Sequence, residues 1–182
     1  MPDLWVFGYG SLMWRPGFEH EECRPALLRG YHRSFCVYSH VHRGTPEKPG
    51  LVFGLDAGGS CRGVAFRVAA SRAEETRRYL QAREQVTLVY RGAVKKVELV
   101  GEGARVEALC FVVDRAHGQY AGRLDFDAQV RLIAEGEGSS GKNPDYLEST
   151  VRHLDEAGLR DDGLSRLWHA VEQRLRQSAV SA

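Results

Sequence analysis

The chain has 182 residues, of which 43% are hydrophobic and 27% charged, a balance typical of one globular domain. Its formal net charge of +1 gives no overall field that would attract nucleic acid or an anionic membrane surface. No apolar stretch approaches the roughly 18 residues that a membrane span needs, and the acidic start of the chain is unlike a signal peptide. We therefore expect a single domain over residues 1–182, located in the cytoplasm.

The first two thirds of the chain are predicted to form β-strands. Short apolar runs lie between glycine- and proline-rich turns at residues 4–7, 35–38, 51–55 and 64–68. Residues 94–100 and 106–113 are typical of a β-hairpin across Gly101-Glu102-Gly103. These runs indicate a mainly antiparallel sheet or barrel.

Helices are predicted once within this region and throughout the last third. Ser71-Arg-Ala-Glu74 fits a capping box at the start of a helix that reaches Glu84. A second helix is expected over 127–134, and a third is opened by Asn143 as N-cap and ended by Gly158. Spaced apolar residues from Leu164 to Leu175 predict the last helix. The fold class is therefore α+β, with helices packed around the sheet and a helical C-terminal third.

The stretch VFGYGSLMW, residues 6–14, breaks an apolar strand with two glycines. Glycine reaches positive φ without a steric penalty and also lets another backbone or a ligand come close. Successive N–H groups in such a turn can hold an anion. Gly8, Gly10 and Ser11 are therefore a candidate carboxylate-binding loop, although the same spacing also suits an ordinary strand-ending turn.

A carboxylate falls in line with the buried face of the first helix. Ala73, Thr76 and Leu80 are spaced by three and four residues, and the next step of four reaches Glu84. Burial would raise the pKa of Glu84 and make it a usable general base near neutral pH. The alternative is a glutamate that extends into solvent where the helix frays. The arginines at 77, 78 and 83 are expected on the solvent side or its borders.

Three other patterns are set aside. The segment GEGSSGKN, residues 136–143, nearly matches two nucleotide-binding motifs, but a helix precedes it where both motifs require a strand, so we expect a flexible loop. His40 and His42 have no local acidic or cysteine partner and are interpreted as ordinary surface or hydrogen-bonded histidines. The four cysteines, which have no metal spacing, are interpreted as reduced core residues: Cys23, Cys36, Cys61 and Cys110.

Five motifs resemble the γ-glutamylcyclotransferase family, particularly its ChaC branch. In chain order they are VFGYGSLMW, HRGTPEKPGL (42–51), CRGVAFRV (61–68), YLQARE (79–84) and GKNPDYLESTVRHLDEAGLRDDGL (141–164). The likeness extends from about residue 4 to residue 171. Many ChaC members continue the Arg-Glu pair with Gly-Gly-Tyr, whereas this chain continues with residues 85–90, QVTLVY.

The resemblance implies a small barrel-like fold and an enzyme that needs no cofactor and no metal. ChaC-type members cleave glutathione to 5-oxoproline and cysteinylglycine, with the glutamate that matches Glu84 as the catalytic residue. The implied substrate-binding positions are Val6, Phe7, Gly8, Tyr9, Gly10, Ser11, Leu12, Arg43 and Tyr146. Residues 9–12 would hold the α-carboxylate, Tyr146 would hydrogen-bond the substrate, and Arg43 would form a wall or contact the peptide carboxylate.

Two alternatives stay open at this point. Besides cleavage of glutathione, the chain could be a cyclotransferase for another γ-glutamyl amine or a non-catalytic module of the same fold that binds a small carboxylate. In each case the expected partner is a small molecule, with no nucleic acid and no membrane, and the oligomeric state is open.

Overall fold

The computed structural model describes residues 2–84 and 88–181, which form two compact units. Unit 1 comprises residues 1–34 and 54–117, and unit 2 comprises residues 35–53 and 118–182. The single domain over 1–182 stays a prediction. None of the helices in the described residues is long and apolar enough to cross a membrane.

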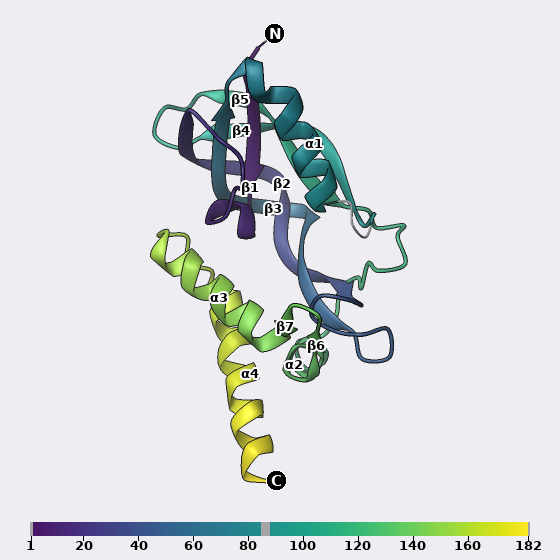
Figure 1. Ribbon diagram of the computed structural model, residues 1–182. Helices are drawn as coiled ribbons and strands as arrows, with labels where there is room; N and C mark the ends of the chain where they lie inside the picture. Colours follow the sequence, from purple (N-terminus) through teal and green to yellow (C-terminus); the bar gives the residue numbers. More distant parts are fainter. Residues whose placement is uncertain (1, 85–87, 182) are drawn as a thin grey trace. The chain divides into compact units, whose positions relative to one another are not determined.

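The strands of the described residues form a closed barrel in the order β1-β3-β2-β4-β5 (Figure 1). Strand β1 runs antiparallel to β3 and parallel to β5, and β4 is antiparallel to β2 and β5. The barrel is therefore mainly antiparallel, as predicted. The strand bounds are β1 Leu4–Gly8, β2 Glu22–Ser39, β3 Gly50–Val68, β4 Tyr90–Leu99 and β5 Arg105–Val113.

Two of the predicted strands proved to be one. The runs at 51–55 and 64–68 both belong to β3, and Gly58 and Gly59 lie between them with φ of +105° and +66°. The strand continues through a glycine pair that looked like a turn. The predicted hairpin is confirmed, since β4 pairs with β5 and its turn uses Gly101 and Gly103 at φ +95° and +63°.

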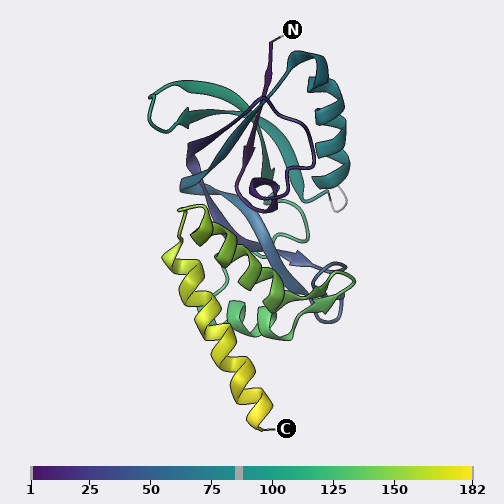
Figure 2. The same cartoon turned by 60° about the vertical axis from the view of Figure 1, so that its left-hand side comes forward.

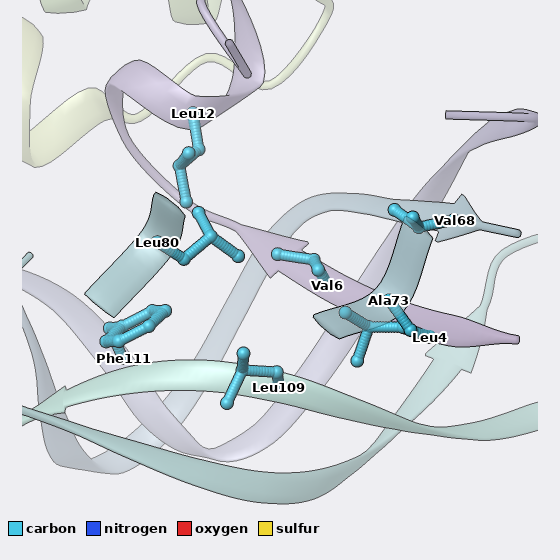
Figure 3. Close-up of a cluster of buried hydrophobic side chains, with 8 residues drawn as sticks. All are labelled: Leu4, Val6, Leu12, Val68, Ala73, Leu80, Leu109 and Phe111. Atoms are coloured by element: carbon cyan, nitrogen blue, oxygen red, sulfur yellow. The ribbon is translucent and has the colours of Figure 1, made fainter. Parts of the chain in front are cut away.

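The core of unit 1 joins the barrel to helix α1, Ala73–Glu84. Alternate residues of β1 point inward because strand side chains alternate between the two faces, and the helix contributes Ala73 and Leu80. The turn after β1 contributes Leu12 to the same cluster. The cluster drawn in Figure 3 is Leu4, Val6, Leu12, Val68, Ala73, Leu80, Leu109 and Phe111. This core therefore fixes the turn after β1 and helix α1 to one another.

The start of α1 differs from the prediction. Ser71 lies inside a 3-10 turn, Ala70–Arg72, that precedes the helix, so the predicted capping box is wrong. The Ala70 N–H donates instead to Asp3 Oδ1 at 3.0 Å. A carboxylate at the start of β1 thus takes the place that a local cap would fill. The helix ends as predicted at Glu84.

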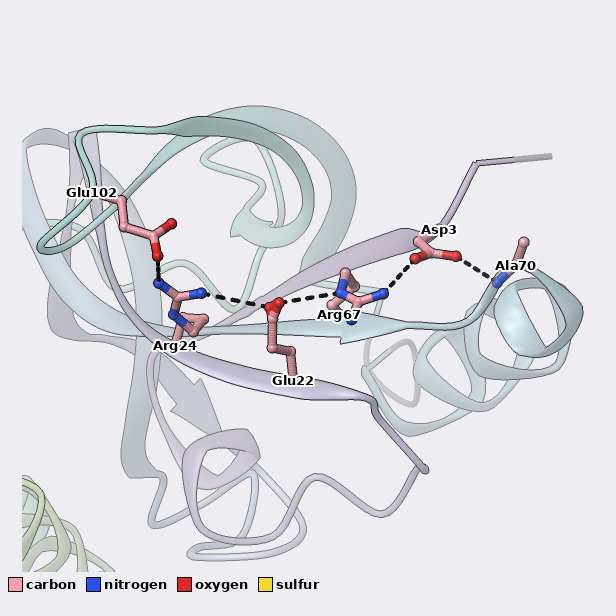
Figure 4. A network of polar contacts seen from close by, with 6 residues as sticks. All are labelled: Asp3, Glu22, Arg24, Arg67, Ala70 and Glu102. Carbon is pink, nitrogen blue, oxygen red and sulfur yellow. Dashed lines mark hydrogen bonds and ion pairs between the residues drawn. The ribbon is translucent and has the colours of Figure 1, made fainter.

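A row of ion pairs runs across the surface of unit 1 (Figure 4). Arg67 contacts Asp3 at 2.7 Å and Glu22 at 3.3 Å, and Arg24 bridges Glu22 to Glu102. These side chains come from the start of β1, from β2 and β3, and from the β4–β5 turn. Partly exposed pairs contribute little each, so this row adds little to the stability of the fold.

The described part of unit 2 combines three helices and a short hairpin with the end of β2 and the start of β3 (Figure 2). Helix α4 packs against α2 and α3, and the buried residues of the three helices include Ile133, Leu147, Leu154, Leu167 and Val171. Asp125 caps α2 and Asp161 caps α4 by accepting backbone N–H bonds. The bounds are α2 Phe126–Glu135, β6 Glu137–Gly138, β7 Gly141–Lys142, α3 Asn143–Glu156 and α4 Asp162–Val180.

The segment before α3 corrects two predictions. Residues 137–142 are not a flexible loop, because β6 and β7 pair there as a hairpin. Asn143 is not the N-cap, which is Lys142, although Pro144 does occupy the first turn. The side chain of Asn143 is fully buried and forms hydrogen bonds with the backbone of Leu51.

Candidate active site

The turn after β1 depends on close approach rather than on unusual backbone angles. Gly8 is not among the described glycines with positive φ, and Gly10 has φ −135°. A Cβ on Gly8 would lie 3.2 Å from Leu12 Cβ and 3.4 Å from the Met13 nitrogen. On the other side, a Cβ on Gly63 of β3 would overlap with the Gly8 carbonyl oxygen. Of the two predicted uses of glycine, positive φ is wrong for this pair, and Gly8 is present for close packing.

The residues from 6 to 12 differ in how far they are exposed to solvent. Val6 and Phe7 are fully buried, backbone included, and Leu12 is 5% exposed, so Val6 and Phe7 offer no surface that a ligand could contact directly. A 3-10 turn over Ser11–Met13 follows, closed by a bond from the Met13 N–H to the Gly10 carbonyl. The Ser11 side chain faces outward. Its hydroxyl and the first N–H groups of the turn are the donors that could meet an anion.

Arg33, which was not predicted from the sequence, holds the turn after β1 through hydrogen bonds. Its Nε donates to the Tyr9 carbonyl at 2.6 Å, and its Nη2 donates to the Arg62 carbonyl at 2.7 Å. The guanidinium thereby ties the turn to strand β3. No local pattern marks this residue, because both of its partners are more than twenty positions away in the sequence.

Glu84 ends α1 with a largely buried carboxylate. Its side chain is 18% exposed, so the alternative of a glutamate extended into solvent is not what the structure contains. Burial raises the pKa of Glu84 above its usual 4.5, and the nearby Arg83 guanidinium opposes that rise. The Arg83 Nε lies 3.9 Å from Glu84 Oε1. Such a carboxyl is a stronger base than an exposed glutamate.

Arg83 lies at the border of the solvent side, which agrees with the prediction for this residue. Its side chain is 21% exposed, and its two terminal nitrogens donate to Ser11 Oγ, to Tyr79 Oη and to two backbone carbonyls. Arg77 and Arg78 are exposed as expected. The end of α1 therefore contacts the turn after β1 through Arg83.

In unit 2, Arg43 and Tyr146 lie together. The Arg43 guanidinium carbon is 5.4 Å from the centre of the Tyr146 ring, a cation–π arrangement, and Arg43 Nη1 donates to the Lys142 carbonyl at 3.1 Å. Glycines crowd the Arg43 backbone: a Cβ on Gly50 would overlap with the Arg43 carbonyl oxygen, and one on Gly136 would lie 2.7 Å from it. The backbone of Arg43 therefore packs so closely against Gly50 and Gly136 that neither position tolerates a larger residue.

The motif N-x-x-Y binds one edge of strand β3. Asn143 Oδ1 accepts from the Leu51 N–H at 2.7 Å, and its Nδ2 donates to the Leu51 carbonyl at 2.8 Å. Tyr146 Oη accepts from the Phe53 N–H at 3.3 Å. Leu51 and Phe53 are two residues apart, so their N–H groups point to the same edge of the strand. The motif thus anchors the first turn of α3, a role that its spacing alone did not reveal.

The two histidines and the segment 136–143, none of which was assigned to the site from sequence, contact other protein groups in unit 2. His42 Nδ1 lies 2.8 Å from Ser140 Oγ, and His40 stacks on Tyr38. A Cβ on Gly138 would overlap with the Val41 carbonyl oxygen, so the space beside this glycine is filled by protein backbone. Within residues 2–84 and 88–181, no cluster of three His, Cys, Asp or Glu side chains suits a metal ion.

Comparison with known proteins defines the class. The model of the ChaC-like protein family matches residues 4–174. The glutathione-specific γ-glutamylcyclotransferase of Escherichia coli is 35% identical over 175 residues, which are 96% of this chain and 75% of that protein. The human glutathione-specific γ-glutamylcyclotransferase 1 is 36% identical, over 92% of this chain and 78% of that protein.

The fold agrees with these relatives. The crystal structure of a yeast γ-glutamyl cyclotransferase specific to glutathione superposes with a TM-score of 0.83 at 23% identity, covering 95% of this chain and 97% of that one. The described barrel and helices therefore have the γ-glutamylcyclotransferase fold, as predicted. The chain belongs to the ChaC-like family. Residues 85–87, where this chain departs from the Gly-Gly-Tyr of many ChaC members, lie outside the described residues.

Proposed function

We propose that this chain is a γ-glutamylcyclotransferase that converts glutathione to 5-oxoproline and cysteinylglycine, with Glu84 as general base and then general acid. The activity is the one in the names of its bacterial and human relatives. One observation carries the residue assignment: the Glu84 carboxylate is largely buried at the end of α1, beside an arginine that contacts Ser11.

The reaction is an intramolecular transfer. The α-ammonium of the γ-glutamyl group gives a proton to Glu84, and the freed amine attacks the γ-carbonyl of the same residue. The new C–N bond closes the five-membered lactam, and the amide bond to cysteine breaks. The leaving amine takes the proton from Glu84 and also the second proton that the ring nitrogen gives up as the lactam forms, so it departs as an ammonium group and no water and no cofactor enter the balance.

The substrate must be folded so that its two reacting ends meet. Residues 9–12 are proposed to hold the α-carboxylate through backbone N–H groups and the Ser11 hydroxyl, which orients the amine toward its own carbonyl. Some of these N–H groups would instead face the developing oxyanion. A raised pKa suits Glu84 to this work because a stronger base removes the ammonium proton more readily, while Arg83 favours the ionised form that must accept it.

The other assignments follow from the sequence. Substrate contact by Arg43 and by Tyr146 stays a prediction, supported by the cation–π arrangement that fixes the arginine over the ring. A cytoplasmic location, and a small molecule rather than nucleic acid or membrane as the partner, fit the near-neutral charge and the absence of a long apolar run in the sequence.

The test is release of 5-oxoproline from glutathione by the purified protein, without added metal or ATP. Glu84→Gln is expected to lower kcat by about 10²- to 10⁴-fold, the usual contribution of a general acid–base group. Glu75→Gln, an exposed glutamate on the same helix, is the matched control and should leave kcat unchanged. A Glu84→Gln protein at full rate would show that another group is the base.

A panel of γ-glutamyl amides separates the remaining alternatives. Turnover of another amide without turnover of glutathione would change the substrate but keep the chemistry. A shift in melting temperature with these compounds, with turnover of none, would indicate a binding module.

A further inference from the structure

Arg83 neither gives nor takes a proton in the reaction proposed above, and its terminal nitrogens reach four hydrogen-bond acceptors, none of which belongs to the base. We propose that Arg83 is a positioning residue that clamps the segment Ser11–Pro16 to the end of α1. The clamp fixes the substrate-binding turn relative to the carboxylate of Glu84. Its catalytic consequence rests on the proposed function, whereas its structural consequence does not.

The acceptors of Arg83 lie at both ends of one segment. Nη1 donates to the carbonyls of Arg15 at 2.6 Å and Pro16 at 3.1 Å, and Nη2 donates to Ser11 Oγ at 3.0 Å. The 3-10 turn between them ends at Met13, so the two carbonyls beyond it need partners outside the turn. A guanidinium presents its donors in a rigid planar fork and can serve several acceptors at once.

A second contact supports the same arrangement. Tyr79 lies four residues before Arg83, on the same side of α1, and its hydroxyl accepts from Arg83 Nη1 at 3.1 Å. A Cβ on Gly17, which has φ +76°, would overlap with this hydroxyl. Phe18 packs edge-on against the rings of Phe66 and Tyr79. The chain after Pro16 therefore lies directly on the helix face that carries the clamp.

The bond from Arg83 also determines which hydrogen bonds the Ser11 hydroxyl can still form. A hydroxyl has one hydrogen and two acceptor lone pairs, and the Arg83 bond uses one of those lone pairs. The hydrogen of Ser11 stays available to donate to a substrate carboxylate. Because the bond from Arg83 is charge-assisted, it polarises the hydroxyl and makes it a better donor.

The experiment compares Arg83→Met, Arg83→Lys and the control Arg78→Met. Arg78 lies on the same helix, with a side chain that is 77% exposed and an ion pair to Glu74. For each folded protein, kcat and KM are measured with glutathione, and amide hydrogen exchange is measured over residues 9–16. The exchange measurement does not depend on turnover.

Arg83→Met is expected to lower kcat by about 10²-fold, because a shift of about 1 Å between reacting groups can have an effect of this size. KM should rise less than tenfold, and amide exchange over residues 9–16 should become at least ~10-fold faster as the segment opens locally. Arg83→Lys, which keeps the charge but not the fork, should recover only a small part of kcat. Arg78→Met should match the wild type in all three measurements.

Three results would overturn the proposal. One is an Arg83→Met protein with wild-type exchange over residues 9–16. Another is a loss of melting temperature with an unchanged kcat per folded molecule, which would assign Arg83 a role in stability alone. The third is full recovery of kcat by Arg83→Lys, which would show that charge rather than the clamp matters. If the wild type releases no 5-oxoproline from any γ-glutamyl amide, the proposed function fails, and hydrogen exchange alone decides whether the clamp exists.

Discussion

Units 1 and 2 each contain residues predicted to contact the substrate, but they fix those residues by different chemistry. In unit 1, the turn after β1 is held by two partly exposed guanidinium groups, those of Arg33 and Arg83. In unit 2, the first turn of α3 is held by the neutral amide of Asn143, which is fully buried. Water can replace a broken contact at a partly exposed cation but not at a buried amide. We therefore expect a broken link in unit 1 to reduce activity and one in unit 2 to reduce stability.

The largest effect on stability is expected for Asn143→Ala. The substitution leaves the Leu51 N–H and carbonyl without the two bonds that Asn143 makes. Each unpaired buried group costs about 1–3 kcal/mol, so the free energy of unfolding should fall by about 2–5 kcal/mol. Urea denaturation measures this change. Asp145→Asn, an exposed position in the same helical turn, is the control and should change it by less than about 1 kcal/mol. An equally small effect of Asn143→Ala would remove the contrast between the units.

Asn143 also illustrates where sequence reasoning stopped. The pair Asn143-Pro144 correctly predicted that a helix starts here, because caps and first-turn prolines are local signals. The partner of the side chain is Leu51, 92 positions away, and no spacing within the motif encodes it. Sequence located the residue but assigned it the wrong hydrogen bond.

The same division applies to α1 and to β3. Helical periodicity, which depends only on neighbouring residues, placed Glu84 in line with the buried face, although it left a solvent-exposed side chain open. The contacts of Arg83 were not predicted, because they depend on carbonyls that the chain brings over from residues 15 and 16. The glycine pair in β3 was interpreted as a turn, since composition does not distinguish a turn from a strand that continues through glycines. Helical periodicity and the β4–β5 hairpin could be predicted from neighbouring residues, whereas these contacts between distant residues could not.

A smaller effect is expected for Glu84→Gln on stability, and it has the opposite sign. Burial raises the pKa of Glu84 above its usual 4.5, so between the unfolded and folded pKa values the folded protein binds the additional proton. Stability contributed by this group therefore falls as pH rises through that window. Removing the charge should raise the melting temperature at pH 8 and leave it unchanged near pH 4, whereas activity is lost.

Melting curves of wild type and Glu84→Gln at several pH values measure this effect. Glu75→Gln, in which an exposed carboxylate is neutralised, should show no such trend with pH. A melting temperature that falls at pH 8 in Glu84→Gln would mean that the ionised carboxylate stabilises unit 1. The loss of activity could then no longer be separated from a loss of structure.

The smallest effect is expected for Asp3→Asn, within the row of ion pairs on unit 1. The hydrogen bond from Arg67 lowers the pKa of Asp3 below its usual 3.8, and the bond from the Ala70 N–H adds to this. A lowered pKa contributes stability above pH 3.8 that is lost as pH falls through the folded value. Asparagine keeps an oxygen for Ala70 but loses the charge.

The melting temperature of Asp3→Asn should accordingly fall slightly at pH 7 and low salt. The difference from wild type should shrink in high salt, because pairs this exposed are screened. Arg160→Gln, which breaks an exposed ion pair with Asp162 in unit 2, should cause no measurable change. If Asp3→Asn destabilised the protein as much as Asn143→Ala, exposed charges would anchor unit 1 as firmly as the buried amide anchors unit 2. The contrast between exposed charges in unit 1 and a buried amide in unit 2 would then not predict which substitutions reduce activity and which reduce stability.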